Sequence, residues 1–238
     1  MAKKSTPKLL KKSGGVKTPP KLLKVKKPTF TKVEFGLVLK ELKKHYPDAH
    51  CALNFTTPFE LLVATVLSAQ CTDERVNKVT PELFKKFGTP LAMSKATIDD
   101  LEDLVRSTGF YKNKAKNLKA LSETLVAEHG GEVPASMESL FALPGVGRKT
   151  ANVVLGNAFG IASGVVVDTH VTRLANRFGW VRETDAVKIE AALNKMCPES
   201  DWIMLSHYLI SHGRAICVAR SPKCASCFLN DACPQRGV

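Results

Sequence analysis

The segment 143-LPGVGRKTANVVL-155 places two glycines around a valine, immediately before an apolar helical pattern. Gly145 and Gly147 indicate a tight bend, because glycine adopts backbone angles that a side chain would forbid. Pro144 is expected to end the preceding helix, since helical backbone is disfavoured just before a proline. After the bend, apolar residues at i, i+3, i+4 and i+7 form one helix face: Ala151, Val154, Leu155 and Ala158. The segment therefore predicts a helix–hairpin–helix unit over about residues 137–158.

Such a bend leaves N–H groups unpaired at the start of the second helix, where the helix dipole is positive. These groups suit a single phosphate of a nucleic-acid backbone and read no base sequence. We therefore expect DNA contacts from Gly145, Val146, Gly147 and Arg148. The alternative is an ordinary turn between helices, but the adjacent basic pair favours DNA.

Lys149 has two possible roles, because a phosphate ligand should be charged whereas an attacking amine must be neutral. The helix start, the neighbouring Arg148 and burial in a closed site would all disfavour the ammonium form. The sequence therefore favours a reactive amine at position 149.

Helical periodicity continues along the chain from Thr31, and no segment has convincing strand alternation. The fold class is therefore predicted as all-α. Helix starts are expected at Thr57, Thr80 (ending at Gly88), Thr97 (ending near Gly109) and Ser136, the last burying Met137, Leu140 and Phe141. Further helices are expected over about 112–129, 185–196 and 201–216.

The net charge of +13 is concentrated at the N-terminus, where residues 1–28 carry ten lysines and no acidic residue. Proline, glycine and a single charge sign predict a disordered tail, which either aids solubility or tethers the protein to a polyanion such as DNA. No stretch reaches the roughly 18 apolar residues that span a bilayer, so no membrane partner is expected. We expect a soluble, intracellular protein.

Four of the seven cysteines crowd near the C-terminus: Cys217, Cys224, Cys227 and Cys233, with gaps of six, two and five residues. Four thiolates at close spacing can hold either a zinc ion or an iron–sulfur cluster. The scattered Cys51, Cys71 and Cys197 are expected to be buried free thiols.

The segments LPGVGRKTANVVL, LSAQCTDERVNK, STGFYKNKAKNL and VDTHVTRLANR occur in one order and together resemble the bacterial endonuclease III family of DNA glycosylases with lyase activity. The resemblance covers about Thr31 to Cys233. It implies two helical domains with a DNA cleft between them: a six-helix barrel over 52–162, containing the hairpin, and an iron–sulfur domain made of 29–51 and 163–238. It also implies a monomeric, cytoplasmic enzyme that is associated with the nucleoid.

The resemblance implies that Lys149 is the catalytic lysine and Asp168 the catalytic aspartate. A damaged nucleotide is flipped out of the duplex, and the amine attacks C1′ of its sugar as the base leaves. The carboxylate stabilises positive charge on the sugar. β-Elimination from the resulting Schiff base then nicks the strand on the 3′ side. By itself, an aspartate at this position is more often a helix cap.

Gln70 matches the residue that enters the space left by the flipped nucleotide, and Phe110 matches the family's apolar wedge, where leucine is familiar. The alternative for Gln70 is a solvated residue at a helix end, and the alternative for Phe110 is a buried core residue. Asp73 matches an acid near the active site. Phe141 stands where the family often has a glutamate, which weakens any proton relay through that position.

The order of the cysteine gaps matches the [4Fe–4S] cluster of the family, so the resemblance favours iron–sulfur over zinc. In the family, the loop between the first two ligands presents basic residues to DNA, and Arg220 and Lys223 fit that role here. The expected substrate is duplex DNA with oxidised pyrimidines or abasic sites. Two alternatives remain: a monofunctional adenine-mismatch glycosylase, disfavoured by Lys149 and by the chain stopping just after Cys233, and a non-catalytic iron–sulfur DNA-binding scaffold.

Overall fold

The computed structural model describes residues 32–238, which form eleven α-helices and three short 3₁₀ turns without any strand. The helices are α1 (Phe35–His45), α2 (Pro58–Leu67), α3 (Asp73–Phe87), α4 (Pro90–Lys95), α5 (Ile98–Val105), α6 (Tyr111–Glu128), α7 (Met137–Ala142), α8 (Arg148–Phe159), α9 (Thr169–Arg177), α10 (Ala186–Met196) and α11 (Trp202–Ala215). The 3₁₀ turns are η1 (Arg106–Thr108), η2 (Glu199–Asp201) and η3 (Cys224–Ser226). The prediction of an all-α fold is confirmed. The lysine-rich tail over residues 1–28 lies outside the described residues.

Four helix starts with a side-chain cap are where the sequence indicates them. Thr57, Thr97 and Ser136 each accept a hydrogen bond from the backbone N–H three residues ahead, and Asp185 caps α10 in the same way. Each cap satisfies one of the N–H groups that a helix start leaves free. These starts were therefore predictable from local sequence.

The expected helix start at Thr80 is wrong, because α3 begins at Asp73 and runs through Pro81. Its cap is Thr72, whose Oγ1 accepts from the Arg75 N–H at 3.2 Å. Proline inside a helix removes one hydrogen bond. The continuous buried stripe of Val76, Val79, Thr80 and Leu83 carries the helix past that point. The expected end at Gly88 is correct.

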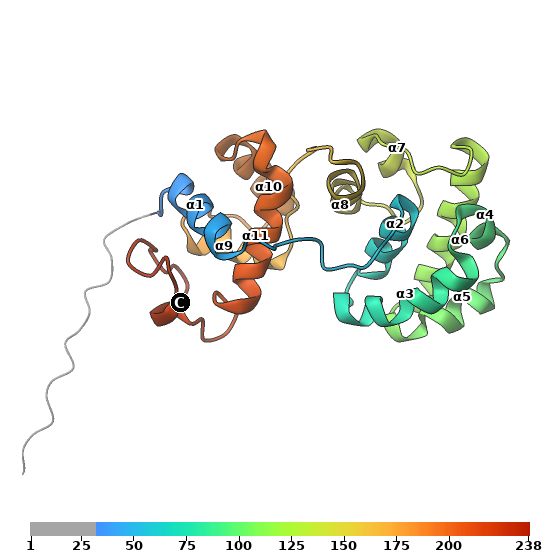
Figure 1. Cartoon of the computed structure of the whole chain (residues 1–238), viewed down its shortest axis with the longest axis horizontal. Coiled ribbons are helices and arrows are strands. Elements are labelled where there is room, and N and C mark those ends of the chain that lie inside the picture. Colours follow the sequence, from blue (N-terminus) through green and yellow to red (C-terminus); the bar gives the residue numbers. More distant parts are fainter. Residues whose placement is uncertain (1–31) are drawn as a thin grey trace, which may run out of the picture.

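The buried side chains form two separate hydrophobic cores. One is built by α2 to α8, from Leu53 to Leu155, and the other joins α1 to α9, α10, α11 and the C-terminal loops. Figure 1 shows the two groups of helices side by side, with the chain crossing between them before α2 and again after α8. The hairpin helix α8 therefore lies at the boundary between the two halves.

The expected burial of Phe141 is wrong. Leu140 is fully buried in the first core, whereas Phe141 is 59% exposed on the next position of the short helix α7. A six-residue helix can direct only one narrow face inward, and Leu140 occupies it. None of the helices described in residues 32–238 combines the length and apolar character needed to cross a membrane.

Candidate functional site

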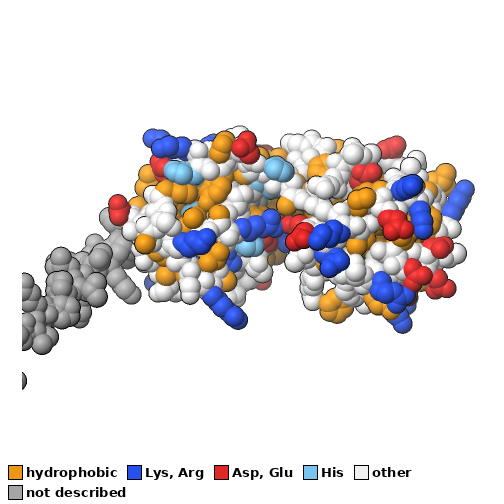
Figure 2. All heavy atoms as spheres, turned by 60° about the horizontal axis from the view of Figure 1, so that its bottom comes forward, with side chains coloured by type: hydrophobic (Ala, Val, Ile, Leu, Met, Phe, Trp, Pro, Cys, Tyr) orange, Lys and Arg blue, Asp and Glu red, His pale blue; other side chains and the backbone are white. Residues whose placement is uncertain are grey.

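A cleft of about 640 Å³ lies between the two halves of the molecule. Its walls come from the end of α2 and start of α3, from α8, from the segment before α9, and from α11. Lys149, Asp168 and Gln70 all line it. On the face seen in Figure 2, lysine and arginine side chains lie on both sides of the junction between the halves. The cleft brings together three predicted site residues from different parts of the chain.

The bend before α8 needs its first glycine for backbone reasons. Gly145 has φ +75°, and a Cβ there would lie 2.8 Å from atoms of the Asn117 side chain. Gly147, by contrast, has an extended backbone (φ −92°, ψ 171°) that any residue adopts, so the expectation of forbidden angles there is wrong. Among the residues that the structure describes, no atom lies within 4 Å of a Cβ placed at position 147. The missing side chain therefore leaves the start of α8 open to an approaching group.

Within residues 32–238, no side chain caps the start of α8. In the described residues, the N–H groups of Gly147, Arg148 and Lys149 donate to no protein acceptor. Val146, which is also expected to contact DNA, has a buried side chain, and its N–H donates to the Leu143 carbonyl at 3.1 Å. The open donors at this helix start can thus hold an anion, with Val146 supporting the bend from below.

Arg148, which is expected to contact DNA, is paired within the protein. Its Nε and Nη2 donate to Glu190 Oε2 and Oε1 at 3.0 and 2.8 Å, which is a bidentate ion pair. This pairing raises the pKa of the Arg148 guanidinium, first through the hydrogen bonds with Glu190 and then through its charge. The positive charge next to Lys149 is therefore balanced within the protein.

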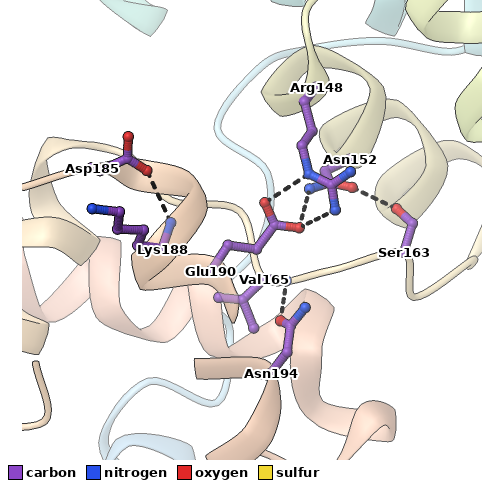
Figure 3. A network of polar contacts seen from close by, with 8 residues as sticks. All are labelled: Arg148, Asn152, Ser163, Val165, Asp185, Lys188, Glu190 and Asn194. Carbon is purple, nitrogen blue, oxygen red and sulfur yellow. Dashed lines mark hydrogen bonds and ion pairs between the residues drawn. The ribbon is translucent and has the colours of Figure 1, made fainter. Parts of the chain in front are cut away.

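The Arg148–Glu190 pair belongs to a polar network that joins the halves (Figure 3). Glu190, on α10, is only 6% exposed and also accepts from Asn152 Nδ2 at 3.2 Å. The Asn152 amide oxygen in turn accepts from the Ser163 hydroxyl at 2.7 Å. Gly164 passes so close to Glu190 that a side chain there would collide with the carboxylate. The network fixes α8 against α10 and the linker between them.

Lys149, in the first turn of α8, is exposed at the cleft. The protein therefore does not bury its amine, and Arg148 offers it little net positive charge. Of the three features expected at Lys149, the described residues supply the helix start but neither a buried amine nor an unpaired neighbouring charge.

Asp168 is both a helix cap and a cleft residue. It is half-buried at the N-cap of α9, where its Oδ1 accepts from the Val171 N–H at 2.8 Å. The bond to Val171 fixes the carboxylate at the cleft wall, on the opposite half from Lys149. The helix-cap interpretation and the catalytic one are therefore compatible.

Gln70 and Phe110 each project from a sharp bend with a left-handed backbone, φ +54° and +48°. Gln70 is exposed in the connection between α2 and α3, and Phe110 is 63% exposed just before α6. Exposing an aromatic ring of this size costs hydrophobic free energy, and core burial, the alternative for Phe110, does not occur. Both side chains are available to a partner.

Asp73 forms a second link between the halves. Its carboxylate pairs with Arg214 Nη2 at 2.6 Å, joining the start of α3 to the end of α11, and both residues line the cleft. The carboxylate of Asp73 also lies at the positive end of the α3 dipole.

Cys217, Cys224, Cys227 and Cys233 line one hollow, together with apolar residues such as Phe178 and Ile216. Backbone N–H groups of Leu229 and Gln235 donate to the sulfurs of Cys227 and Cys233, each at 3.4 Å. Burial raises the pKa of Cys224 and Cys227, and that of Cys233 to about 11, so positive charge is needed to hold these sulfurs as thiolates. An all-sulfur donor set with N–H bonds to sulfur suits iron.

Two residues beside this hollow were missed by sequence reasoning. Arg177 is buried and donates to Cys217 Sγ at 3.3 Å and to the carbonyls of Val218 and Ala219. His212 lies 3.6 Å from Cys227 Sγ, and burial lowers its pKa to about 4, so it is neutral. Through its bonds to the two carbonyls, Arg177 holds in place the loop that carries Arg220 and Lys223, which are both exposed. Only the fold brings these two residues to the cysteines.

Comparison with known proteins agrees with this architecture. Residues 63–199 match the HhH-GPD superfamily of base excision DNA repair proteins, and residues 217–233 match the iron–sulfur binding domain of endonuclease III. The second match begins and ends on Cys217 and Cys233. It decides between zinc and iron in favour of a [4Fe–4S] cluster.

Two curated relatives are similar over most of their length. Endonuclease III of Synechocystis sp. is 53% identical over 198 residues, which cover 83% of this chain and 90% of the relative. Endonuclease III of Escherichia coli is 42% identical over 199 residues, covering 84% and 94%. A solved structure of a trapped endonuclease III–DNA covalent intermediate superposes with a TM-score of 0.80 at 46% identity, covering 83% of this chain and 93% of that one. The chain belongs to the endonuclease III family.

Proposed function

We propose that Lys149 is the attacking amine, and Asp168 the assisting carboxylate, of a reaction that removes oxidised pyrimidines from duplex DNA and then nicks the strand. The protein is a base-excision-repair DNA glycosylase with lyase activity. One observation carries the residue assignment: the starts of α8 and α9, from different halves, present an amine and a carboxylate to one cleft.

The reaction follows from the chemistry of these two groups. With the damaged nucleotide turned into the cleft, the neutral Lys149 amine attacks C1′ and the base leaves. The Asp168 carboxylate stabilises positive charge on the sugar, and its hydrogen bond to the Val171 N–H keeps it in place. Opening of the C1′–O4′ bond of the sugar then gives a Schiff base between Lys149 and C1′, which acidifies the 2′ hydrogens. β-Elimination removes a 2′ proton and expels the 3′ phosphate, which breaks the strand. Water as nucleophile would stop at the abasic site.

The remaining site residues hold the DNA. Gly145, Gly147 and the start of α8 bind a backbone phosphate, Gln70 fills the gap left by the flipped nucleotide, and Phe110 wedges between bases. Arg220 and Lys223 add phosphate contacts from the loop between Cys217 and Cys224, and those two cysteines with Cys227 and Cys233 are the ligands of the cluster. The cluster, when bound, cross-links this part of the chain and positions the loop.

The organisation of the chain follows the same assignment. Residues 52–162 form the barrel domain, whereas residues 29–51 and 163–238 form the cluster domain. The lysine-rich residues 1–28 tether the enzyme to DNA. We place the protein in the cytoplasm, in association with the nucleoid.

Borohydride reduction tests the proposed function. Wild-type protein is mixed with a duplex that contains one oxidised thymine, and borohydride reduces any Schiff base to a stable bond. We expect a covalent protein–DNA adduct and a nick on the 3′ side of the lesion, read by gel electrophoresis. Base release without an adduct would indicate a monofunctional glycosylase. No base release would contradict the proposal itself.

Asp168 allows its two roles to be separated. Asp168→Asn keeps a good helix cap but removes the charge, so we expect excision to slow by about 10²-fold or more with a nearly unchanged Tm. Asp168→Ala removes the cap as well, which costs about 1 kcal/mol and roughly 2–4 °C of Tm. Single-turnover kinetics and thermal melting measure the two effects. An Asp168→Asn enzyme with wild-type excision would leave Asp168 as a cap only.

A further inference from the structure

The buried cation Lys114 stands out among the apolar residues of α6. It occupies the face that also carries Leu118, Leu121 and Leu125, and it is only 5% exposed. Burial lowers the pKa of Lys114, because the charged ammonium is less stable when it is removed from water. No carboxylate pairs with it in residues 32–238. Its position therefore needs another explanation.

The ammonium of Lys114 bonds two carbonyls from separate elements. Its Nζ donates to Leu67 O and to Thr108 O, each at 2.8 Å. Leu67 is the last residue of α2 and Thr108 the last of η1, so each carbonyl belongs to a helical end that lacks an internal donor. A cation is also favoured at the negative end of a helix. The Lys114 ammonium thus supplies a hydrogen-bond donor to the C-terminal carbonyls of two helical segments.

The chain leaves these two ends toward the residues that contact DNA in the proposed function. Gln70 comes three residues after Leu67, and Phe110 comes two residues after Thr108. The Lys114 N–H also donates to the Phe110 carbonyl at 3.1 Å. Both bends have positive φ, a backbone that persists only when its surroundings hold it. Lys114 therefore connects, through these hydrogen bonds, the helical ends from which the two bends start.

We propose that Lys114 is a positioning residue that holds the Gln70 and Phe110 bends at a fixed separation, so that plug and wedge enter the duplex together. The inference rests on the proposed function, because the roles of Gln70 and Phe110 come from it. Opening the duplex requires both side chains at set places, and an error of about 1 Å in such a placement lowers rates by about 10²-fold.

Lys119 offers a matched control on the same helix. Its Nζ donates to the carbonyls of Ser94 and Ala96 at 2.8 and 2.9 Å, so it closes the end of α4 as Lys114 closes α2. No residue of α4 lines the cleft. Lys114→Met and Lys119→Met therefore each remove two ammonium–carbonyl bonds, Lys119→Met together with an ion pair to Glu123 at 3.5 Å, but only the first touches the two bends.

The experiment compares the two variants on two substrates in single-turnover reactions. On duplex DNA with one oxidised thymine, we expect Lys114→Met to excise about 10- to 100-fold more slowly than wild type, whereas Lys119→Met keeps its rate within about twofold. On single-stranded DNA with a preformed abasic site, which needs no duplex opening, both variants should nick within about twofold of wild type. A 2-aminopurine placed beside the lesion becomes more fluorescent when its base is unstacked. We expect this fluorescence to be lower with Lys114→Met than with wild type, and unchanged with Lys119→Met.

A background without plug and wedge supplies the decisive comparison. In a Gln70→Ala, Phe110→Ala enzyme, adding Lys114→Met should slow excision by no more than about twofold further. Equal losses on both substrates, equal losses in the two lysine variants, or a full additional loss in this background would each overturn the role of Lys114. If Lys114→Met does not fold, Lys114→Arg takes its place and must likewise lose more activity on duplex DNA than on single-stranded DNA. A wild-type enzyme that traps no adduct would instead refute the proposed function.

Discussion

A Lys149→Met enzyme is expected to form no borohydride adduct and to nick DNA at least about 10³-fold more slowly than wild type. The fold should not change, because Lys149 is exposed and its side chain has no partner within residues 32–238, so unfolding free energy should stay within about 0.5 kcal/mol. Gel analysis of trapped complexes and thermal melting measure both quantities.

The same variant separates the two roles that the sequence leaves open for this lysine. If Lys149 only bound a phosphate, its loss would weaken DNA binding and lower the salt slope of log K by about one, while chemistry on saturating DNA would persist. Lys188→Met is the control, because Lys188 is exposed, pairs with Glu183 at 3.4 Å and does not line the cleft. Trapping by Lys149→Met at the wild-type level would remove the amine from the mechanism.

The fold was predictable wherever a local signal decides it. Thr57, Thr97 and Ser136 each stand directly before a helix, and the hydroxyl, proline or acidic residues around them act within one turn. The same signal misled at Thr80-Pro81, where packing of the buried α3 stripe prevails over the local preference. The helices α1 and α4 were not predicted: α1 begins on a Glu34 cap, which is an unusual start signal, whereas α4 begins on Thr89-Pro90, the same kind of signal as Thr57-Pro58, and was missed.

The site was predictable as a set of residues but not as an arrangement. The motifs identify Lys149 and Asp168, whereas only the packing of two cores brings them to one cleft. Glu190 carries no motif, and its partner Arg148 lies 42 residues away in sequence. Lys114 did leave a signal, since it falls in register with Leu118, Leu121 and Leu125 on an apolar face. Long-range polar pairs of this kind follow from tertiary packing, which periodicity does not encode.

Breaking the Arg148–Glu190 pair from the arginine side is expected to cost about 2–4 kcal/mol of unfolding free energy, or roughly 5–15 °C of Tm. In Arg148→Met, the carboxylate of Glu190 stays buried with Asn152, at 3.2 Å, as its one remaining partner among residues 32–238. The cost arises mainly from that uncompensated charge, because the Arg148 side chain is itself 46% exposed and partly solvated. Thermal melting by circular dichroism measures the change.

A double substitution shows whether the buried charge is responsible. Arg148→Met with Glu190→Met removes both partners, so it should recover much of the stability lost in Arg148→Met alone. Lys78→Met is the control for an ion pair in solvent: Lys78 lies 2.6 Å from Glu74 with both side chains mostly exposed, and its loss should change Tm by no more than about 1 °C.

The outcome also decides what Arg148 does beside the attacking amine. If Arg148 contacted a DNA phosphate, as the sequence alone suggests, Arg148→Met would lower the salt slope of DNA binding by about one and leave Tm nearly unchanged. The bidentate pair leads to the opposite expectation: a large loss of Tm with an unchanged salt slope, because the guanidinium is already committed to Glu190. The pair fixes α8, and with it Lys149, to the half that carries Asp168. An Arg148→Met protein as stable as wild type would mean that another contact holds the two halves together.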